Sequence, residues 1–478
     1  MSPTLLLSVV VVYFALLLGV AWLASRGADN ESFFVGNRNS NWLLVAFGMI
    51  GTSLSGVTFI SVPGQVGAAA FSYFQIALGQ FIGYFVIAFV LLPLYYRLKL
   101  SSIYRFLGER LGPQAYRTGA GIFSVSRTLG ATARLYLVIK ILQEAILDSF
   151  GVPFWLTTAV IIGLILLYTF EGGVKTIVWT DTLQTSGMLL GLVVCVLYLL
   201  NGLGLSFSES VATLHAQGLS DIFVTDVASR SFWGKQLLAG IFIAVAMTGM
   251  DQEMMQKNIS VKRLSDSQKN VVLLSVVMLI VVLMFLFLGG LLQLFALKTG
   301  LTARGDELFP AVVLGHLPEW VQIIFVVALI SALFPSADGA LTALTSSFCI
   351  DLLGMDKRTW TEAKKTSLRR RVHLSFAAIF FLAVMVFRWI NDPSMIGLIL
   401  KLAGYTYGPL LGLFAFGMLT KRQPRDGLVP WVCLAAPLLC WVIDSQQAAL
   451  FGDYGIGLEL LLLNGGLTFA GLWLVSRK

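Results

Sequence analysis

Residues 41–66 read NWLLVAFGMIGTSLSGVTFISVPGQV, and the architecture expected for the whole chain follows from this pattern. The stretch is long and apolar enough to cross a bilayer, which takes about 20 predominantly apolar residues. Its middle, Gly51 to Thr58, holds two glycines and four hydroxyl side chains, a poor composition for a continuous helix. Non-helical backbone at membrane depth is tolerated only where it is buried or lines a cavity. We therefore predict a broken helix whose carbonyl groups face a ligand, with close packing of small residues as the alternative.

The composition agrees with a membrane protein. Of the 478 residues, 57% are hydrophobic and 12% are charged, whereas soluble domains carry about 25% charged residues. This excludes a soluble enzyme, a nucleic-acid-binding protein and a disordered scaffold. The net charge of +8 lies mainly in short loops between apolar runs, as expected of membrane topology. Four cysteines inside apolar runs indicate no disulfide framework, and three histidines in loops or at run edges argue against a histidine proton relay.

Apolar stretches recur along the whole chain and predict an all-α polytopic protein with thirteen transmembrane helices. We place them at about 4–25, 41–66, 72–96, 119–147, 153–170, 176–201, 231–256, 271–297, 318–352, 372–391, 394–419, 427–446 and 455–475. No loop is long enough for a separate domain, so residues 1–478 form one transmembrane unit.

The loop charges predict the orientation. Of the 33 Lys and Arg residues, 24 fall on the side that carries the C-terminus and 5 on the other side. Positive charge accumulates on the cytoplasmic side of membrane proteins. We therefore expect the N-terminus outside and the C-terminus inside, in a plasma (inner) membrane.

The ninth stretch carries an intramembrane carboxylate, Asp338, which costs about 2.5–3.5 kcal/mol on insertion scales and is a functional hypothesis by default. Pro335 cannot donate a backbone hydrogen bond to Ser331, so that carbonyl is free for another partner. With the Ser336 hydroxyl, these oxygens suit a small cation. A structural kink, with Asp338 paired to a helix dipole or a basic residue, is the alternative.

Other polar residues mark the remaining candidates. Asp181, at the start of the sixth stretch, could serve as a second cation ligand, an exit relay or a helix cap. Arg127 and Arg134 lie seven residues apart on one helix face and could grip a carboxylate or balance the acidic residues. Gln75 and Gln80 suit a polar solute, and the Asp251-Gln252-Glu253 segment resembles a hydrated helix end. Metalloprotease, P-loop and zinc spacings are missing, so a membrane enzyme has little support.

At residues 168–184, YTFEGGVKTIVWTDTLQ, the sequence resembles the sodium:solute symporter family, and Tyr407-Gly408-Pro409-Leu410-Leu411-Gly412-Leu413 adds support. The resemblance covers essentially the whole chain. It implies the leucine-transporter fold, with inverted five-helix repeats formed by helices 2–6 and 7–11, in which helices 2 and 7 are broken. The divisions would be 1–40 (first helix and loop), 41–201, 231–419 and 427–478 (two C-terminal helices), with the second break near Gly240 or Thr248-Gly249.

The resemblance also implies a sodium site. Its carbonyl ligands would come from Gly51, Leu54 and Ala332, and a hydroxyl from Ser336. Pro335 departs from the family by replacing a hydroxyl residue of this site. A second site in some members uses hydroxyls just beyond, where this chain has Ser336, Asp338 and Gly339, together with the aspartate that corresponds to Asp181, so Asp338 adds a carboxylate beside the cation path. We hypothesise that Asp338 compensates for Pro335.

Substrate positions implied by the resemblance are Ser53, Ser55, Thr58 and Gln80, to which the residues themselves add Arg127 and Arg134. The expected function is Na⁺-coupled symport of a small polar organic solute, with the arginines favouring a carboxylated one, by alternating access across the lipid bilayer. Proton coupling through Asp338 or Asp181 is the main alternative, followed by a channel or a solute sensor. No nucleic acid and no obligate protein partner are expected.

Overall fold

The computed structural model describes residues 3–25, 41–100, 102–392 and 394–477, and this part is nearly all helical. The predicted loop at 26–40, with Arg26 and Arg38, lies outside the described residues. The helices of the first half are α1 (Pro3–Ser25), α3 (Trp42–Ser53), α4 (Gly56–Ala69), α5 (Tyr73–Val86), α6 (Leu92–Arg97), α7 (Arg105–Leu111), α8 (Pro113–Leu142), α9 (Phe154–Leu203) and α10 (Phe207–Ala216).

The helices of the second half are α11 (Trp233–Ala244), α12 (Gln252–Ile259), α13 (Leu264–Thr299), α14 (Leu308–His316), α15 (Glu319–Ser347), α16 (Glu362–Ile390), α17 (Met395–Thr406), α18 (Gly408–Leu419), α19 (Val429–Ser445), α20 (Gln447–Phe451) and α21 (Leu460–Leu474). Two short strands, β1 (Gln423–Pro424) and β2 (Ser476–Arg477), pair antiparallel.

Long apolar helices dominate the structure, as the sequence predicts. Among the described residues, seven helices are long and apolar enough to cross a membrane, and four bent pairs bring the number to eleven. Every predicted stretch overlaps one or more helices. Large apolar side chains such as Leu167 (68% exposed), Leu382 (63%) and Trp389 (89%) lie on the outside, as suits contact with lipid. The exact count of thirteen spans stays a prediction.

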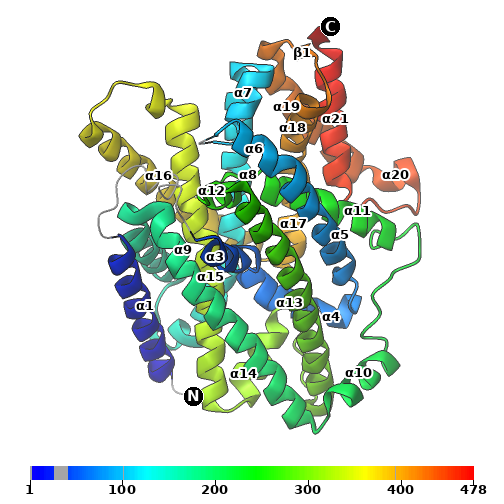
Figure 1. Ribbon diagram of the computed structural model, residues 1–478. Coiled ribbons are helices and arrows are strands. Elements are labelled where there is room, and N and C mark those ends of the chain that lie inside the picture. Colours follow the sequence, from blue (N-terminus) through cyan, green and yellow to red (C-terminus); the bar gives the residue numbers. More distant parts are fainter. Residues whose placement is uncertain (1–2, 26–40, 101, 393, 478) are drawn as a thin grey trace.

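The helix break predicted in the second stretch is present. Helices α3 and α4 meet at an angle of 52°, with Leu54 at the end of α3 in a non-helical conformation (φ −89°, ψ 45°). Glycine and hydroxyl residues surround the break, and neither type favours a helix interior. Both half-helices pack against α13 and α15, and α3 also contacts α9. Figure 1 shows α3 in the middle of the bundle, between α1 on one side and α20 and α21 on the other.

A second break separates α11 from α12, at 65°. A π-helical turn at Val245–Gly249 ends α11, and the Asp251 side chain caps α12 by accepting hydrogen bonds from the backbone amides of Glu253 and Met254. Of the two predicted positions, Thr248-Gly249 is therefore next to the break and Gly240 is wrong. Gly240 lies within α11, where α11 packs so tightly on α5 that a Cβ here would collide with the backbone carbonyl of Ile76.

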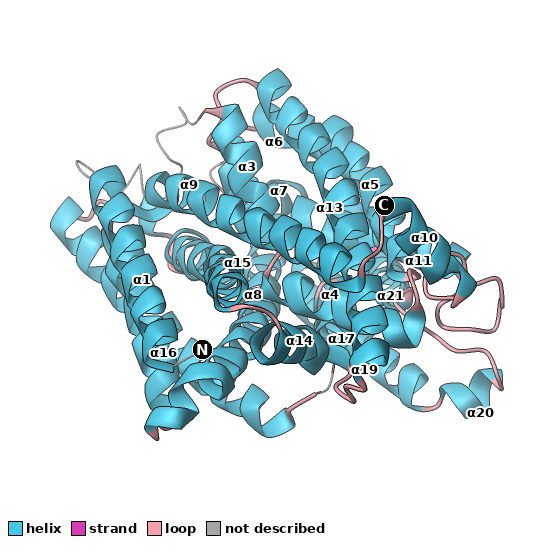
Figure 2. Ribbon diagram, turned by 90° about the horizontal axis from the view of Figure 1, so that it is seen from below, coloured by secondary structure: helices cyan, strands magenta, loops and turns pink. Residues whose placement is uncertain are grey.

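The fifth and sixth predicted stretches differ from expectation because one helix, α9, contains both. It runs for 50 residues without interruption across residues 171–175, which separate the two predicted stretches and include the Gly172-Gly173 pair. A glycine in a helix interior costs only about 1 kcal/mol relative to alanine, so two of them need not end a helix. The first part of α9 turns back on the end of α8 at 119°, and Thr176–Leu203 is long enough to form a span of its own. Figure 2 shows α9 crossing the bundle beside α15.

Candidate functional site

A pocket lies beside the first break, and its walls come from α3, α4, α5, α8, α11 with the π-helical turn after it, α12, α13 and α17. All six predicted substrate residues line it: Ser53, Ser55, Thr58, Gln80, Arg127 and Arg134. The polar wall is completed by residues that are not among the predicted substrate ligands, namely Thr52, Tyr73, Tyr84 and Thr248. The apolar wall includes Met247, Met254, Met278, Ile396, Ile399 and Leu400. Half of the twenty lining residues are polar and half are apolar, so this pocket is more polar than a typical small-molecule site and suits a polar solute.

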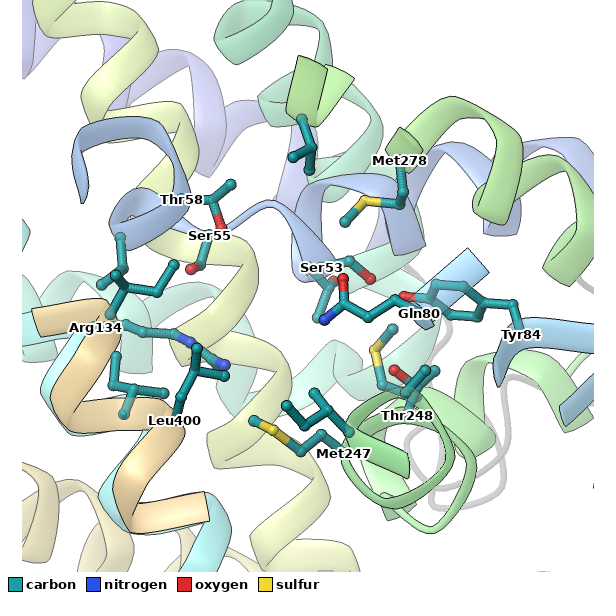
Figure 3. A pocket seen from close by; sticks show the side chains of 18 of the residues that line it. Ser53, Ser55, Thr58, Gln80, Tyr84, Arg134, Met247, Thr248, Met278 and Leu400 are labelled. Carbon is teal, nitrogen blue, oxygen red and sulfur yellow. The ribbon is translucent and has the colours of Figure 1, made fainter. Parts of the chain in front are cut away.

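The polar groups enter this pocket from opposite sides. Figure 3 shows the guanidinium group of Arg134, from α8, directed toward the amide of Gln80, from α5, with Ser53 next to that amide. The two side chains approach the same space, and Leu400 and Met247 border it below. The arrangement offers hydrogen-bond donors and acceptors on two sides of the same space, which apolar side chains also border. It therefore suits a solute with at least one polar group.

The two arginines differ in how their charge is compensated. Arg127 is buried and forms an ion pair with Glu253, and its Nε lies 3.9 Å from an oxygen of Asp251. The Arg134 side chain has no ion pair and no hydrogen bond with any residue that the structure describes. An uncompensated guanidinium in a pocket is a natural anchor for an anionic group, because Arg–carboxylate pairs are bidentate and charge-assisted. Of the two predicted arginines, Arg134 is therefore the one available to a ligand.

The expected sodium ligands lie together where the first break meets α15. A Cβ added to Gly51 would lie 3.6 Å from Pro335 Cγ, and one added to Gly56 would lie 3.6 Å from the Ala332 carbonyl oxygen. Leu54, Ala332 and Ser336 are all buried. The structure thus brings the carbonyl-bearing break against the part of α15 from which the other ligands are expected. Despite Pro335, α15 is one helix from Glu319 to Ser347.

Asp338 is fully buried in α15, and it accepts a hydrogen bond from the Tyr168 hydroxyl at 2.8 Å. About two turns earlier in α15, Ser331 shares a 2.6 Å hydrogen bond with Tyr13 of α1. The predicted pairing of Asp338 with a basic residue is not seen among the described residues within 4.0 Å. Its carboxylate oxygens are therefore not paired with a basic residue of the described chain, and carboxylate oxygens are ligands that suit a small cation.

Asp181 lies in a different place from the one its sequence suggests. It is fully buried within α9, not at a helix end or in a vestibule, and its partner is Lys257 of α12 at 2.7 Å. The same ammonium donates a hydrogen bond to the Thr52 hydroxyl at 2.6 Å. Lys257 follows the predicted stretch 231–256 and is counted among the charges on the C-terminal side of the membrane, but it is only 2% exposed, so placing it in a loop is wrong.

The interpretation of Asp251 and Glu253 as a hydrated helix end is also wrong. Both are buried, because the bend at the second break turns α12 into the bundle. Asp251 accepts a 2.9 Å hydrogen bond from Tyr407, and Glu253 lies between Arg127 and Lys257, 3.5 Å from the latter. The sequence feature that could have indicated this buried cluster is the density of charge, because Asp251, Glu253 and Lys257 follow closely after Gly249 at the end of an apolar run.

Gln75 and His373 have structural partners. Gln75 hydrogen-bonds the backbone around Ser72, Val224 and Ser231, so it ties α5 to the loop before α11 and is not a solute ligand. His373, expected at the edge of an apolar run, is buried in α16, and its two ring nitrogens contact the hydroxyls of Thr169 and Thr345. In the described part of the chain, no group of three or more His, Cys, Asp or Glu residues could hold a metal ion.

Comparison with known proteins gives consistent results. The sodium/sialic acid symporter NanT of Aliivibrio fischeri is 21% identical over 94% of this chain and 89% of its own. The human sodium/iodide cotransporter is 24% identical over 90% of this chain and 68% of its own. A solved Na⁺-coupled sialic acid symporter, described as substrate-bound and outward-open, shares the fold with a TM-score of 0.83, 17% identity and 99% coverage of both chains.

A second solved structure, the nucleobase-cation-symport-1 family transporter Mhp1, matches with a TM-score of 0.56 and 12% identity over 94% of both chains. The model of the sodium:solute symporter family matches residues 33–430, which include both breaks, the pocket and α15. The chain therefore belongs to the sodium:solute symporter family: it is an integral membrane transporter, not an enzyme, and sodium is its coupling ion.

Proposed function

We propose that this protein carries a small carboxylated organic solute into the cytoplasm together with sodium, by alternating access. The observation that carries the choice of solute is Arg134, a guanidinium that faces the pocket with no ion pair among the described residues. A neutral solute would leave this charge uncompensated in a closed pocket, which is costly, whereas a carboxylate would pair with it. Gln80 and Ser53 would hydrogen-bond the remaining polar groups of the solute, and Ser55 and Thr58 would contact it from α4.

Sodium would bind between the first break and α15. The carbonyl oxygens of Gly51, Leu54 and Ala332 and the hydroxyl of Ser336 are its ligands in this proposal, and Asp338 compensates for the hydroxyl that Pro335 lacks. The proximity of Gly51 to Pro335 supports it. Because the break also forms a wall of the solute pocket, bound sodium would hold Ser53 and Ser55 in place for the solute.

The proposed topology has thirteen spans, with the N-terminus outside and the C-terminus inside a plasma (inner) membrane. The inverted repeats comprise residues 41–201 and 231–419, and breaks at α3–α4 and α11–α12 occupy the first helix of each. A potential of 100 mV is worth about 2.3 kcal/mol per translocated net charge. One sodium ion with one carboxylate carries no net charge, so the sodium concentration gradient alone would drive accumulation of the proposed solute, and each further sodium ion would add a factor of roughly 50 from the potential.

The experiment is a thermal-stability screen of the purified protein against carboxylic acids and their neutral amides, in NaCl, followed by uptake into proteoliposomes. We expect a carboxylic acid to bind, and Arg134→Gln to weaken its binding by about 30-fold, because a charge-assisted pair of roughly 2 kcal/mol is lost. Stabilisation by sodium alone should remain.

Lys140→Gln is the matched control, since Lys140 lies on the same helix but outside the pocket lining. This variant should bind the acid as the wild type does. Equal binding of the acid by wild type and Arg134→Gln, or uptake of the amide in place of the acid, would contradict the proposed solute class.

A further inference from the structure

The ammonium group of Lys257 lies among oxygen atoms from three helices. Its nitrogen is 2.7 Å from Asp181 Oδ2 on α9, 2.6 Å from Thr52 Oγ1 on α3 and 3.5 Å from Glu253 Oε1 on α12 itself. The lysine side chain is 3% exposed and the two carboxylates are 0% and 2% exposed. Two carboxylates and a hydroxyl around one positive charge are the ligand types that hard cations select.

A cation at this position is a physical requirement of the bundle. Asp181, Glu253 and Asp338 lie in the same buried region, and only Arg127 and Lys257 form ion pairs within 4.0 Å with any of them among the described residues. Buried carboxylates without a counter-charge are strongly destabilising. Asp181 Oδ1 and Glu253 Oε1 are buried and accept no hydrogen bond from any described group, so the two acids have capacity for a further ligand.

The neighbouring residues of α15 supply no positive charge at this position, so the positive charge there comes from Lys257. Gly339 has no side chain to offer, and a Cβ there would collide with Glu253 Oε1, so the glutamate lies directly on the helix backbone. The next acid, Asp338, is held by the Tyr168 hydroxyl. The Lys257 side chain extends from α12 to Asp181 on α9 and Thr52 on α3.

We infer that the Lys257 ammonium is a tethered cation that fills a second cation subsite at Asp181. The inference rests on the proposed sodium site at the first break. It implies that this transporter binds one sodium ion per cycle and that the second position is latent, closed by the chain's own positive charge. With a carboxylate as the solute, one sodium ion makes transport electroneutral, whereas a second sodium ion would add one net translocated charge and a roughly 50-fold contribution from a potential of 100 mV.

The test is the stoichiometry of ²²Na⁺ binding to the purified protein in lipid nanodiscs. Wild type should bind one sodium ion, and Lys257→Ala, which removes the ammonium and opens its space, should bind two. Lys257→Arg keeps the charge and should bind one. The double variant Lys257→Ala/Asp181→Asn removes the ligand of the opened site and should return to one.

Two sodium ions on wild type would overturn the inference and leave the proposed function standing, and this readout does not depend on any variant folding. One ion on folded Lys257→Ala, as judged by gel filtration and a cooperative thermal transition, would also overturn it. No sodium on wild type would contradict the proposed site at the first break, and the inference with it.

Discussion

The break between α3 and α4 bends the chain by 52° and the break between α11 and α12 by 65°, yet the side chains around the two are of different kinds. The first is flanked by Ser53 and Ser55 and has no charged residue within it. The second is followed by Asp251, Glu253 and Lys257, all buried and paired with Arg127, Tyr407, Asp181 or one another.

This difference separates two roles. At the first break, neutral carbonyl and hydroxyl groups line a pocket and face α15. Because these groups are uncharged, releasing a bound ligand leaves no unpaired buried charge behind. At the second break, the charges are compensated inside the protein, and removing one partner leaves a buried charge. Changes at the second break should therefore affect folding stability first, and changes at the first break should affect ligand binding first.

The largest expected effect is at the second break. Glu253→Gln removes the carboxylate between Arg127 and Lys257, and it should lower the free energy of unfolding by about 3–5 kcal/mol, the usual cost of breaking a buried ion pair. Denaturant unfolding in detergent micelles measures it. Glu144→Gln, whose carboxylate side chain is 57% exposed, is the control and should cost less than about 1 kcal/mol. Similar losses in the two variants would mean that the cluster at the second break is not a stabilising unit.

A smaller effect is expected from crowding the first break. A Cβ in Gly51→Ala would collide with the Thr185 hydroxyl, which bonds the carbonyls of Phe47 and Asp181. We expect a loss of about 1–3 kcal/mol in stability together with weaker sodium binding. Gly130→Ala, in α8 with open space around it, should be neutral or slightly stabilising. Unchanged sodium binding in Gly51→Ala would show that the first break does not form part of the sodium site.

The smallest effect is expected from Pro335 in α15, next to the proposed sodium ligand Ser336. Pro335→Ser restores the hydroxyl that the family pattern has at this position, and one added ligand should tighten sodium binding by roughly 1 kcal/mol, about five-fold. A sodium titration of thermal stability measures it. In the same titration, Asp338→Ala should weaken sodium binding, and more strongly in wild type than in the Pro335→Ser background. Unchanged sodium binding in Asp338→Ala would sink the idea that this carboxylate compensates for the proline.

The first break was predictable because its cause is local. Glycines and hydroxyl residues at the centre of an apolar stretch are unfavourable in any continuous membrane helix. That Arg127 and Arg134 line one pocket was also predictable from the sequence, because a spacing of seven residues in a helix places both side chains on the same face.

The second break and its charges were not predictable in the same way. Thr248-Gly249 and Gly240 are equally plausible hinges by composition, and only the tight packing of Gly240 on α5 decides between them. Charged residues after an apolar run normally face water, so Asp251, Glu253 and Lys257 suggest a helix end. Their burial depends on the 65° turn of α12 toward α9 and α15, which is a tertiary contact.

The most direct measurement is the thermal stability of the purified protein in NaCl, KCl and choline chloride at equal ionic strength. A ligand that binds only the folded state stabilises it by about 2.7 kcal/mol at a concentration of 100 times its Kd, so no solute needs to be known. Sodium binding between the first break and α15 predicts a rise in Tm in NaCl alone, reduced in Ser336→Ala. Equal Tm values in the three salts would contradict the account.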